Sequence, residues 1–257
     1  EKHGTYPIFA VRELFKRFYT MLKFELPDGL EGYHMPHVND APVYCIEGFS
    51  DMDVTGEQHY TTISKLEDLS LTRYSIVYNS LEQGVPRMGI WHHTNDIPVT
   101  KNTMLTMHNL HGTLLRYDNV THNNTAYEAM GGYRSEIQMW QSFDRRTADF
   151  LPYWQYPNLL EVTSDIKGVD LPKDAIKASA YVHKDKGRAI IILANLDLVG
   201  YSLRCRINLK ELGFEGKIED YRIVDPILNN YYYPVVGDEI RLDIYPQRWR
   251  AIQINKK

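Results

Sequence analysis

Cysteine, basic charge and long apolar runs are scarce in this sequence. Only two cysteines, Cys45 and Cys205, occur in 257 residues, and two do not make a disulfide framework. The apolar run around Cys45 predicts a buried thiol there. A formal net charge of −4 lacks the basic footprint of a nucleic-acid binder. No apolar run approaches the roughly 20 residues that span a membrane, so we expect neither a nucleic-acid partner nor a membrane partner.

Motifs for phosphate binding, nucleophilic hydrolysis and metal ligation are missing as well. The sequence has no glycine-rich phosphate loop, no Gly-x-Ser-x-Gly nucleophile elbow and no Cys-x-x-Cys pair. His34 and His37 have His-x-x-His spacing, but no third ligand with convincing spacing accompanies them. We therefore expect no cofactor and no bound metal.

Aromatic side chains, by contrast, are abundant. The chain contains 19 tyrosines and 4 tryptophans, whose rings offer apolar faces and polar tips. A pyranose ring has apolar C–H faces that stack on such rings, so this composition favours a sugar-binding protein. Tyrosine also populates β-strands, which is the alternative explanation for each of these residues.

The first part of the chain predicts βα units. Apolar residues recur at helical spacing over residues 8–23. Short apolar segments typical of buried parallel strands follow at 32–35, 43–46 and 88–91. Helices are expected between and after them, at 61–80, 103–116 and 133–143. Alternation of short strands and helices indicates a parallel sheet.

The pattern changes after about residue 160, where strand candidates follow one another with short turns and little helix. We expect these strands at 178–183, 188–195, 201–207, 218–224, 239–244 and 248–254. Such a series is typical of an antiparallel sandwich. The predicted fold is therefore α/β plus all-β, with one domain at residues 1–165 and a β-sandwich at 166–257.

The first domain is too short for a closed (β/α) barrel, which takes about 250 residues. We expect residues 1–165 to be the C-terminal part of a TIM-type barrel, completed by a preceding segment or by a separate chain. A smaller α/β domain is the alternative.

Short motifs in the same order carry a family resemblance. They are residues 11–17, His34-Met35, 49–51, Gly56-Glu57-Gln58, 110–112, 150–154 and 194–196. Together they resemble a group of bacterial glycoside hydrolases of uncharacterised substrate, which is similar to the retaining β-N-acetylgalactosaminidase family. The resemblance implies a sugar-processing barrel with a C-terminal β domain. It also implies an adjacent Asp-Glu pair acting with the substrate acetamide, and we expect that pair in the part of the barrel that precedes this chain.

The carboxylates after the predicted strand at 43–46 are the local catalytic candidates. Active sites of barrels lie at the carboxyl ends of the strands, and glycoside hydrolysis generally uses two carboxyl groups. We therefore expect Asp51 and Glu47 as catalytic residues and Asp53 as a group that grips sugar hydroxyls. The alternative is that the aspartates cap a turn or a helix.

Further substrate-binding candidates follow other strands. His34 could donate to a sugar hydroxyl, and the resemblance adds Glu57. Trp91 could stack on a sugar beside His92, although a core tryptophan explains it too. Trp154 could line a subsite, although aromatic clusters more often pack domains together.

Two closely spaced sequons, at Asn119 and Asn123, predict N-glycosylation in a polar loop and thus a secreted protein. The expected function is part of a glycoside hydrolase that acts on a polysaccharide or glycan. The alternative is a non-catalytic carbohydrate-binding or structural protein that retains the same architecture, since fold alone does not fix function.

Overall fold

The computed structural model describes residues 8–34, 48–55, 87–89, 106, 108–112, 114–115, 132–228 and 230–257. The chain divides into two compact units. The first contains residues 1–95 and 113–119, and the second contains residues 96–112 and 120–257.

The first unit contains a helix followed by a parallel sheet. Helix α1 spans Ile8–Glu25, and the strands are β1 (Gly32–His34), β2 (Met52–Thr55), β3 (Arg87–Gly89) and β4 (Leu114–Leu115). They form a four-stranded sheet in the order β1-β2-β3-β4, and every neighbouring pair is parallel. The predicted helix and two of the three predicted strands are thus confirmed, and a parallel sheet is present. The described residues do not themselves show a closed barrel.

Several predictions for the first half of the chain need correction or fall outside the described residues. Strand β2 was not predicted. The helix expected over 103–116 ends earlier, because Gly112 has a φ of +77°, the left-handed conformation that terminates helices, and Leu114–Leu115 then form β4. The strand at 43–46, the helix at 61–80 and Cys45 lie outside the described residues.

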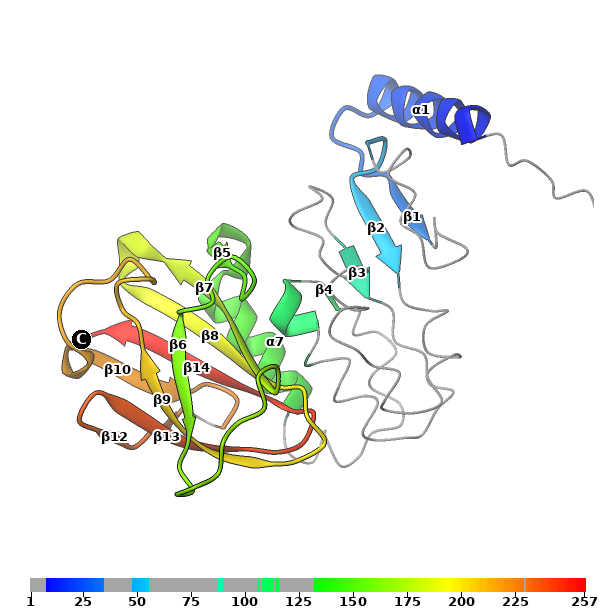
Figure 1. Ribbon diagram of the computed structural model, residues 1–257. Coiled ribbons are helices and arrows are strands. Elements are labelled where there is room, and N and C mark those ends of the chain that lie inside the picture. The colour runs from blue at the N-terminus through cyan, green and yellow to red at the C-terminus, as the bar shows by residue number, and fades with distance from the viewer. Residues whose placement is uncertain are drawn as a thin grey trace, which may run out of the picture. The chain divides into compact units, whose positions relative to one another are not determined.

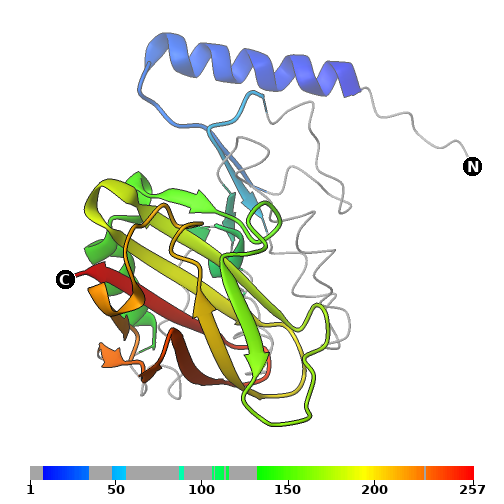
Figure 2. The same ribbon diagram turned by 60° about the vertical axis from the view of Figure 1, so that its left-hand side comes forward.

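The second unit is an antiparallel sandwich with a helix on one side (Figure 1). The elements are α7 (Gly132–Phe143), β5 (Asp149–Leu151), β6 (Leu160–Ser164), β7 (Ile176–His183), β8 (Arg188–Asn195), β9 (Tyr201–Ile207), β10 (Tyr221–Asp225), β11 (Tyr231–Tyr232), β12 (Val235–Val236), β13 (Glu239–Ile244) and β14 (Trp249–Lys256). Short 3₁₀ turns occur at Arg145–Thr147, Lys184–Lys186 and Ile218–Asp220. The sheets have the orders β11-β10-β14-β8-β7-β5 and β12-β13-β9-β6, and Figure 2 shows their strands overlying one another. The predicted sandwich is confirmed.

Strand β8 explains how the sandwich is layered. Its side chains alternate between two apolar clusters, with Ile191 and Leu193 in the core between the sheets and Ile190 and Ile192 in the cluster under α7. All four are fully buried. A strand that is covered on both faces reads as a continuous apolar run, as residues 188–195 do.

Helix α7 covers the outer face of the six-stranded sheet. Its Met139, Trp140 and Phe143 pack with Tyr181 of β7 and Ala251 of β14. The helix predicted at 133–143 is confirmed, and it packs on the sandwich through this face.

Two further expectations concern the cysteine thiols and membrane-crossing helices. Cys205 in β9 is a buried free thiol, and burial raises its pKa to about 12. Among the described residues, no helix combines the length and the apolar character needed to cross a membrane.

Candidate functional site

The carboxyl ends of the parallel strands form one edge of the first sheet. β1 ends at His34 and pairs that residue with Val54, while β2 ends at Thr55 and pairs it with Gly89, the last residue of β3. The three strands therefore end next to one another. His34 lies at this edge, and Asp53 lies inside β2, between Tyr33 and Arg87.

Several candidates lie outside the described residues. They are Glu47, Glu57, Trp91, His92, Asn119 and Asn123. In the sequence, Glu57 comes two residues after β2, and Trp91 and His92 come two and three residues after β3. These are the chain positions that directly follow the carboxyl edge.

Asp51 lies at the opposite, amino end of the sheet. It directly precedes β2, whereas its prediction as a catalytic residue assumed that it follows a strand. Its Oδ2 accepts a hydrogen bond from the Glu31 backbone N–H at 2.9 Å and lies 2.9 Å from Lys23 Nζ. The Tyr19 hydroxyl donates to Oδ1 at 3.4 Å. These contacts tie α1, the start of β1 and the start of β2 together.

The charges of this cluster stabilise one another. The Glu31 N–H and the Lys23 ammonium hold the pKa of Asp51 below its usual value. The hydrogen bond to Asp51 raises the pKa of Lys23, whose ammonium also donates to the Gly29 carbonyl at 2.7 Å. Asp51 is therefore an ionised, satisfied carboxylate, unlike a general acid, which needs a raised pKa.

Trp154 packs inside the second unit. Its ring stacks on His111, with centroids 5.6 Å apart, and meets Tyr153 edge to face at 4.9 Å. His111 Nε2 lies 3.2 Å from the Tyr153 hydroxyl, and the Phe150 ring meets the Trp154 ring edge to face, with centroids 6.3 Å apart. The described contacts of Trp154 thus join the 108–112 segment to the chain around β5, and the indole is only half-buried.

A buried polar network next to this cluster was not predicted. Asn109 Nδ2 donates to Glu136 Oε1 of α7 at 2.8 Å, and Asn109 Oδ1 accepts from Trp140 Nε1 at 3.3 Å. The Tyr181 hydroxyl donates to the Asn109 carbonyl at 3.3 Å. Glu136 stands four residues before Trp140, on the inward face of the predicted helix. A carboxylate on that face was the one sequence signal that could have indicated a buried polar network.

His108 lies beside this network and is buried. Loss of hydration, with smaller contributions from His111 and Arg145, lowers its pKa to about 3. The imidazole is therefore neutral at neutral pH. Among the described residues, no group of three or more His, Cys, Asp or Glu side chains could hold a metal ion.

Comparison with known proteins identifies solved structures with a similar fold. No family model matches the sequence, and no curated protein matches it. Solved structures do match: an alpha-galactosidase I from Mortierella vinacea is 11% identical with a TM-score of 0.58, over 98% of this chain and 65% of that one. A maltogenic alpha-amylase from Thermotoga neapolitana is 10% identical with a TM-score of 0.57, over 99% of this chain and 60% of that one.

A third match leads to the same result. A GH27 β-L-arabinopyranosidase from Geobacillus stearothermophilus is 10% identical with a TM-score of 0.55, over 95% of this chain and 54% of that one. The chain thus spans between 54% and 65% of the length of these structures. At such low identity the likeness concerns the fold alone, and the fold is similar to that of these glycoside hydrolases.

Proposed function

We propose that this chain is the C-terminal part of a glycoside hydrolase that acts on a polysaccharide or glycan. The observation that carries the proposal is the match of almost the whole chain, parallel sheet and sandwich together, to enzymes of that class. The matched enzymes are named for different sugars, so the proposal extends to the reaction class and not to one sugar. The finer link to the β-N-acetylgalactosaminidase family rests on the sequence motifs alone.

The proposed substrate site is the carboxyl edge of the parallel sheet. In barrel enzymes the chemistry takes place at this edge, and here His34 ends β1. Glu57 and Trp91, which follow β2 and β3 in the sequence, supply the groups that a sugar needs: a carboxylate for hydroxyls and a ring for a C–H face. His92 adds a second imidazole. The rest of the barrel, in this proposal, is supplied by a preceding segment or a separate chain.

We propose a structural role for Asp51 in place of the catalytic role that the sequence predicted. Because Asp51 is engaged by Lys23 and the Glu31 N–H at the amino end of β2, we assign it to the stability of the sheet. In barrel enzymes the amino-terminal face contributes to stability, whereas the catalytic residues lie at the carboxyl-terminal face. Glu47 stays a proposed catalytic residue on the sequence argument alone, and hydrolysis needs a second carboxyl group, which we place in the preceding segment.

Hydrolysis assays on the protein that contains this chain test the proposal. A panel of aryl glycosides would include α-galactoside, β-arabinopyranoside, α-maltoside and β-N-acetylgalactosaminide. We expect turnover of at least one, and a fall in kcat/KM of about 10- to 100-fold in Glu57→Gln, the worth of one hydrogen bond to a charged group. The melting temperature of that variant should stay unchanged.

The control variant is Asp51→Asn, which should lower stability at an unchanged kcat per folded molecule. No turnover on any substrate, with saccharide binding retained, would contradict the proposal and favour the non-catalytic carbohydrate-binding alternative. An effect of Asp51→Asn on kcat with unchanged stability would restore Asp51 as a catalytic residue.

A further inference from the structure

A cleft of about 550 Å³ lies on the sandwich, lined by residues of both sheets. Tyr231 of β11 and Arg250 of β14 belong to the six-stranded sheet, while Arg241 and Asp243 of β13 belong to the four-stranded one. The short strand β12 pairs with β13 only at Ile240 and Glu239. The following residues of β13 therefore border the cleft beyond the end of β12.

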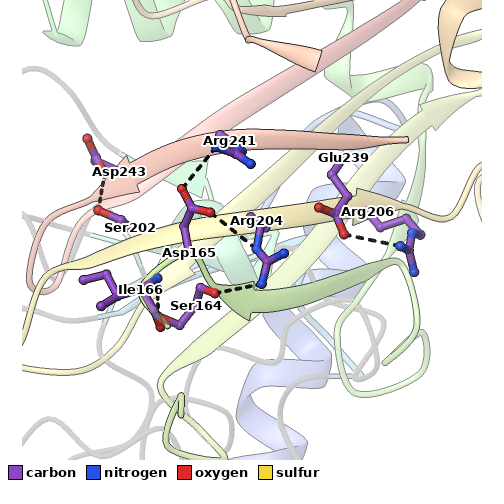
Figure 3. Close-up of polar contacts among 9 residues, drawn as sticks. All are labelled: Ser164, Asp165, Ile166, Ser202, Arg204, Arg206, Glu239, Arg241 and Asp243. Carbon is purple, nitrogen blue, oxygen red and sulfur yellow. Dashed lines mark hydrogen bonds and ion pairs between the residues drawn. The ribbon is translucent and has the colours of Figure 1, made fainter. Parts of the chain in front are cut away.

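The charged groups at this cleft are balanced and ordered. Its described lining includes two aspartates, Asp165 and Asp243, and two arginines, Arg241 and Arg250. Figure 3 shows Asp165 reaching toward Arg241, 3.7 Å away, while Ser202 donates to Asp243 at 2.6 Å. A site with equal numbers of fixed positive and negative groups suits a neutral ligand that both donates and accepts hydrogen bonds.

Arg250 is fixed from two sides. Its Nε donates to the Asp243 carbonyl at 3.0 Å, and its Nη1 lies 3.5 Å from the carboxylate of Asp225. Arg250 is about a quarter exposed, whereas Asp225 is buried. The guanidinium therefore presents its remaining N–H groups from a defined position, which lowers the entropic cost of binding a ligand.

An aromatic ring stands exposed at the same cleft. The Tyr231 side chain is 53% exposed, and its ring meets the buried Tyr233 ring edge to face, with centroids 6.3 Å apart. Tyr233 is held in turn, because its hydroxyl lies 2.8 Å from Asp225 Oδ2. Asp225 Oδ1 also accepts the backbone N–H groups of Ile227 and Leu228 at 2.9 and 3.1 Å. The exposed ring thus rests on a buried support.

A second cleft on the sandwich provides the contrast. It has a volume of about 630 Å³ and is lined by charged side chains that include Glu161, Arg206, Lys217 and Asp238. No aromatic ring occurs among its described lining residues. Only the Tyr231 cleft, of these two, combines a ring with paired donors and acceptors.

We propose that the Tyr231 cleft binds a neutral saccharide, as a site separate from the carboxyl edge of the parallel sheet. The ring of Tyr231 stacks on the apolar C–H face of a sugar. Arg241, Asp243 and Arg250 bond to its hydroxyl groups. Binding at this cleft requires no hydrolysis, so it holds whether or not the chain belongs to an active enzyme.

Binding measurements on the whole chain test this site. The probes are neutral gluco-, galacto- and arabino-oligosaccharides on a glycan array, with uronic-acid and sulfated oligosaccharides for contrast. The best neutral probe is then titrated by calorimetry. We expect Tyr231→Ala to weaken one class of site by up to about tenfold, the scale of one lost aromatic contact, and Tyr231→Phe to retain it.

Two matched variants separate this inference from the others. Tyr232→Ala removes the neighbouring ring, which is 60% exposed and lies against Arg222 at 4.9 Å, and it should leave binding unchanged. Glu57→Gln should leave binding at the Tyr231 cleft unchanged even where it lowers kcat/KM for hydrolysis. The proposal is overturned by binding confined to the anionic probes, by no binding of neutral probes, or by equal losses in Tyr231→Ala and Tyr232→Ala.

Discussion

The sandwich and helix α1 differ in how far they bury their apolar side chains. In the sandwich, Ile191, Leu193 and Leu203 are fully buried between two sheets. On α1, Leu14, Phe18 and Met21 are 50%, 52% and 64% exposed, although they share one face of the helix at spacings of four and three residues. One region encloses a core, and the other leaves an apolar stripe uncovered.

The polar side of α1 makes the contacts instead. Arg12 lies over the Phe49 ring at 5.1 Å, and Tyr19 and Lys23 bind Asp51. At 100° per residue, these positions stand about half a turn away from Leu14 and Phe18. The described part of the sandwich thus encloses its own core, whereas α1 has an apolar face that fits the proposed preceding part of a barrel.

The largest expected effect is in the sandwich core. Leu193→Ala should lower the free energy of unfolding by about 2–5 kcal/mol, because it removes a buried side chain and leaves a cavity. Urea denaturation of the chain, followed by tryptophan fluorescence, measures it. Ile191→Val, the milder control, should cost about 0.5–1.5 kcal/mol. A near-zero effect of Leu193→Ala would mean that this core repacks freely.

Acid should destabilise the second unit through protonation of His108 in the unfolded chain. Its folded-state pKa is about 3, below the ordinary value of 6.5, so below pH 6.5 the unfolded chain binds a proton that the folded chain excludes. As pH is lowered from 6.5, the free energy of unfolding should therefore fall by about 1.4 kcal/mol for each pH unit. Denaturation between pH 6.5 and pH 5 measures this slope above the usual range of carboxyl groups. His108→Gln should flatten the slope, and an unchanged slope would contradict the assignment.

The parts of the fold that sequence predicted well are those where local pattern and burial agree. Residues 201–207 alternate because β9 has one face in the core, and residues 188–195 are apolar throughout because β8 is covered on both faces. Short edge strands were missed, among them β6 and β12, because two to five residues carry too little periodicity. The helix expected over 103–116 failed at Gly112, whose effect depends on its backbone conformation.

The candidate site was harder to predict, because strand direction decides it. Asp51 was placed after a strand at 43–46, but β2 begins at Met52, so its carboxylate lies at the amino end. Because the four-residue strand β2 was not predicted, Asp51 was placed at the wrong end of the sheet. His34 kept its place at a carboxyl end because β1 was predicted within one residue.

A smaller effect is expected at the amino end of the parallel sheet. Asp51→Asn removes the charge that pairs with Lys23 and weakens the acceptor of the Glu31 N–H, so hydrogen exchange at the Glu31 amide should become faster. Because the folded-state pKa of Asp51 is lowered, the wild-type protection is present above the ordinary carboxyl pKa and is lost only as pH falls through the lowered folded-state pKa. Glu25→Gln, an exposed carboxylate at the end of α1, is the control and should leave the Glu31 amide unchanged.

The smallest effect expected in this chain is on the stripe of α1. Phe18→Ala should change the free energy of unfolding of residues 1–257 by no more than about 0.5 kcal/mol, as for an ordinary surface position. In a longer protein whose preceding segment covers the stripe, the same substitution should cost about 3–5 kcal/mol, the value for a buried phenylalanine. Parallel thermal or urea unfolding of the two proteins measures the difference. Equal, small effects in both would show that the stripe has no barrel neighbour, and the contrast between α1 and the sandwich would then be a property of α1 itself.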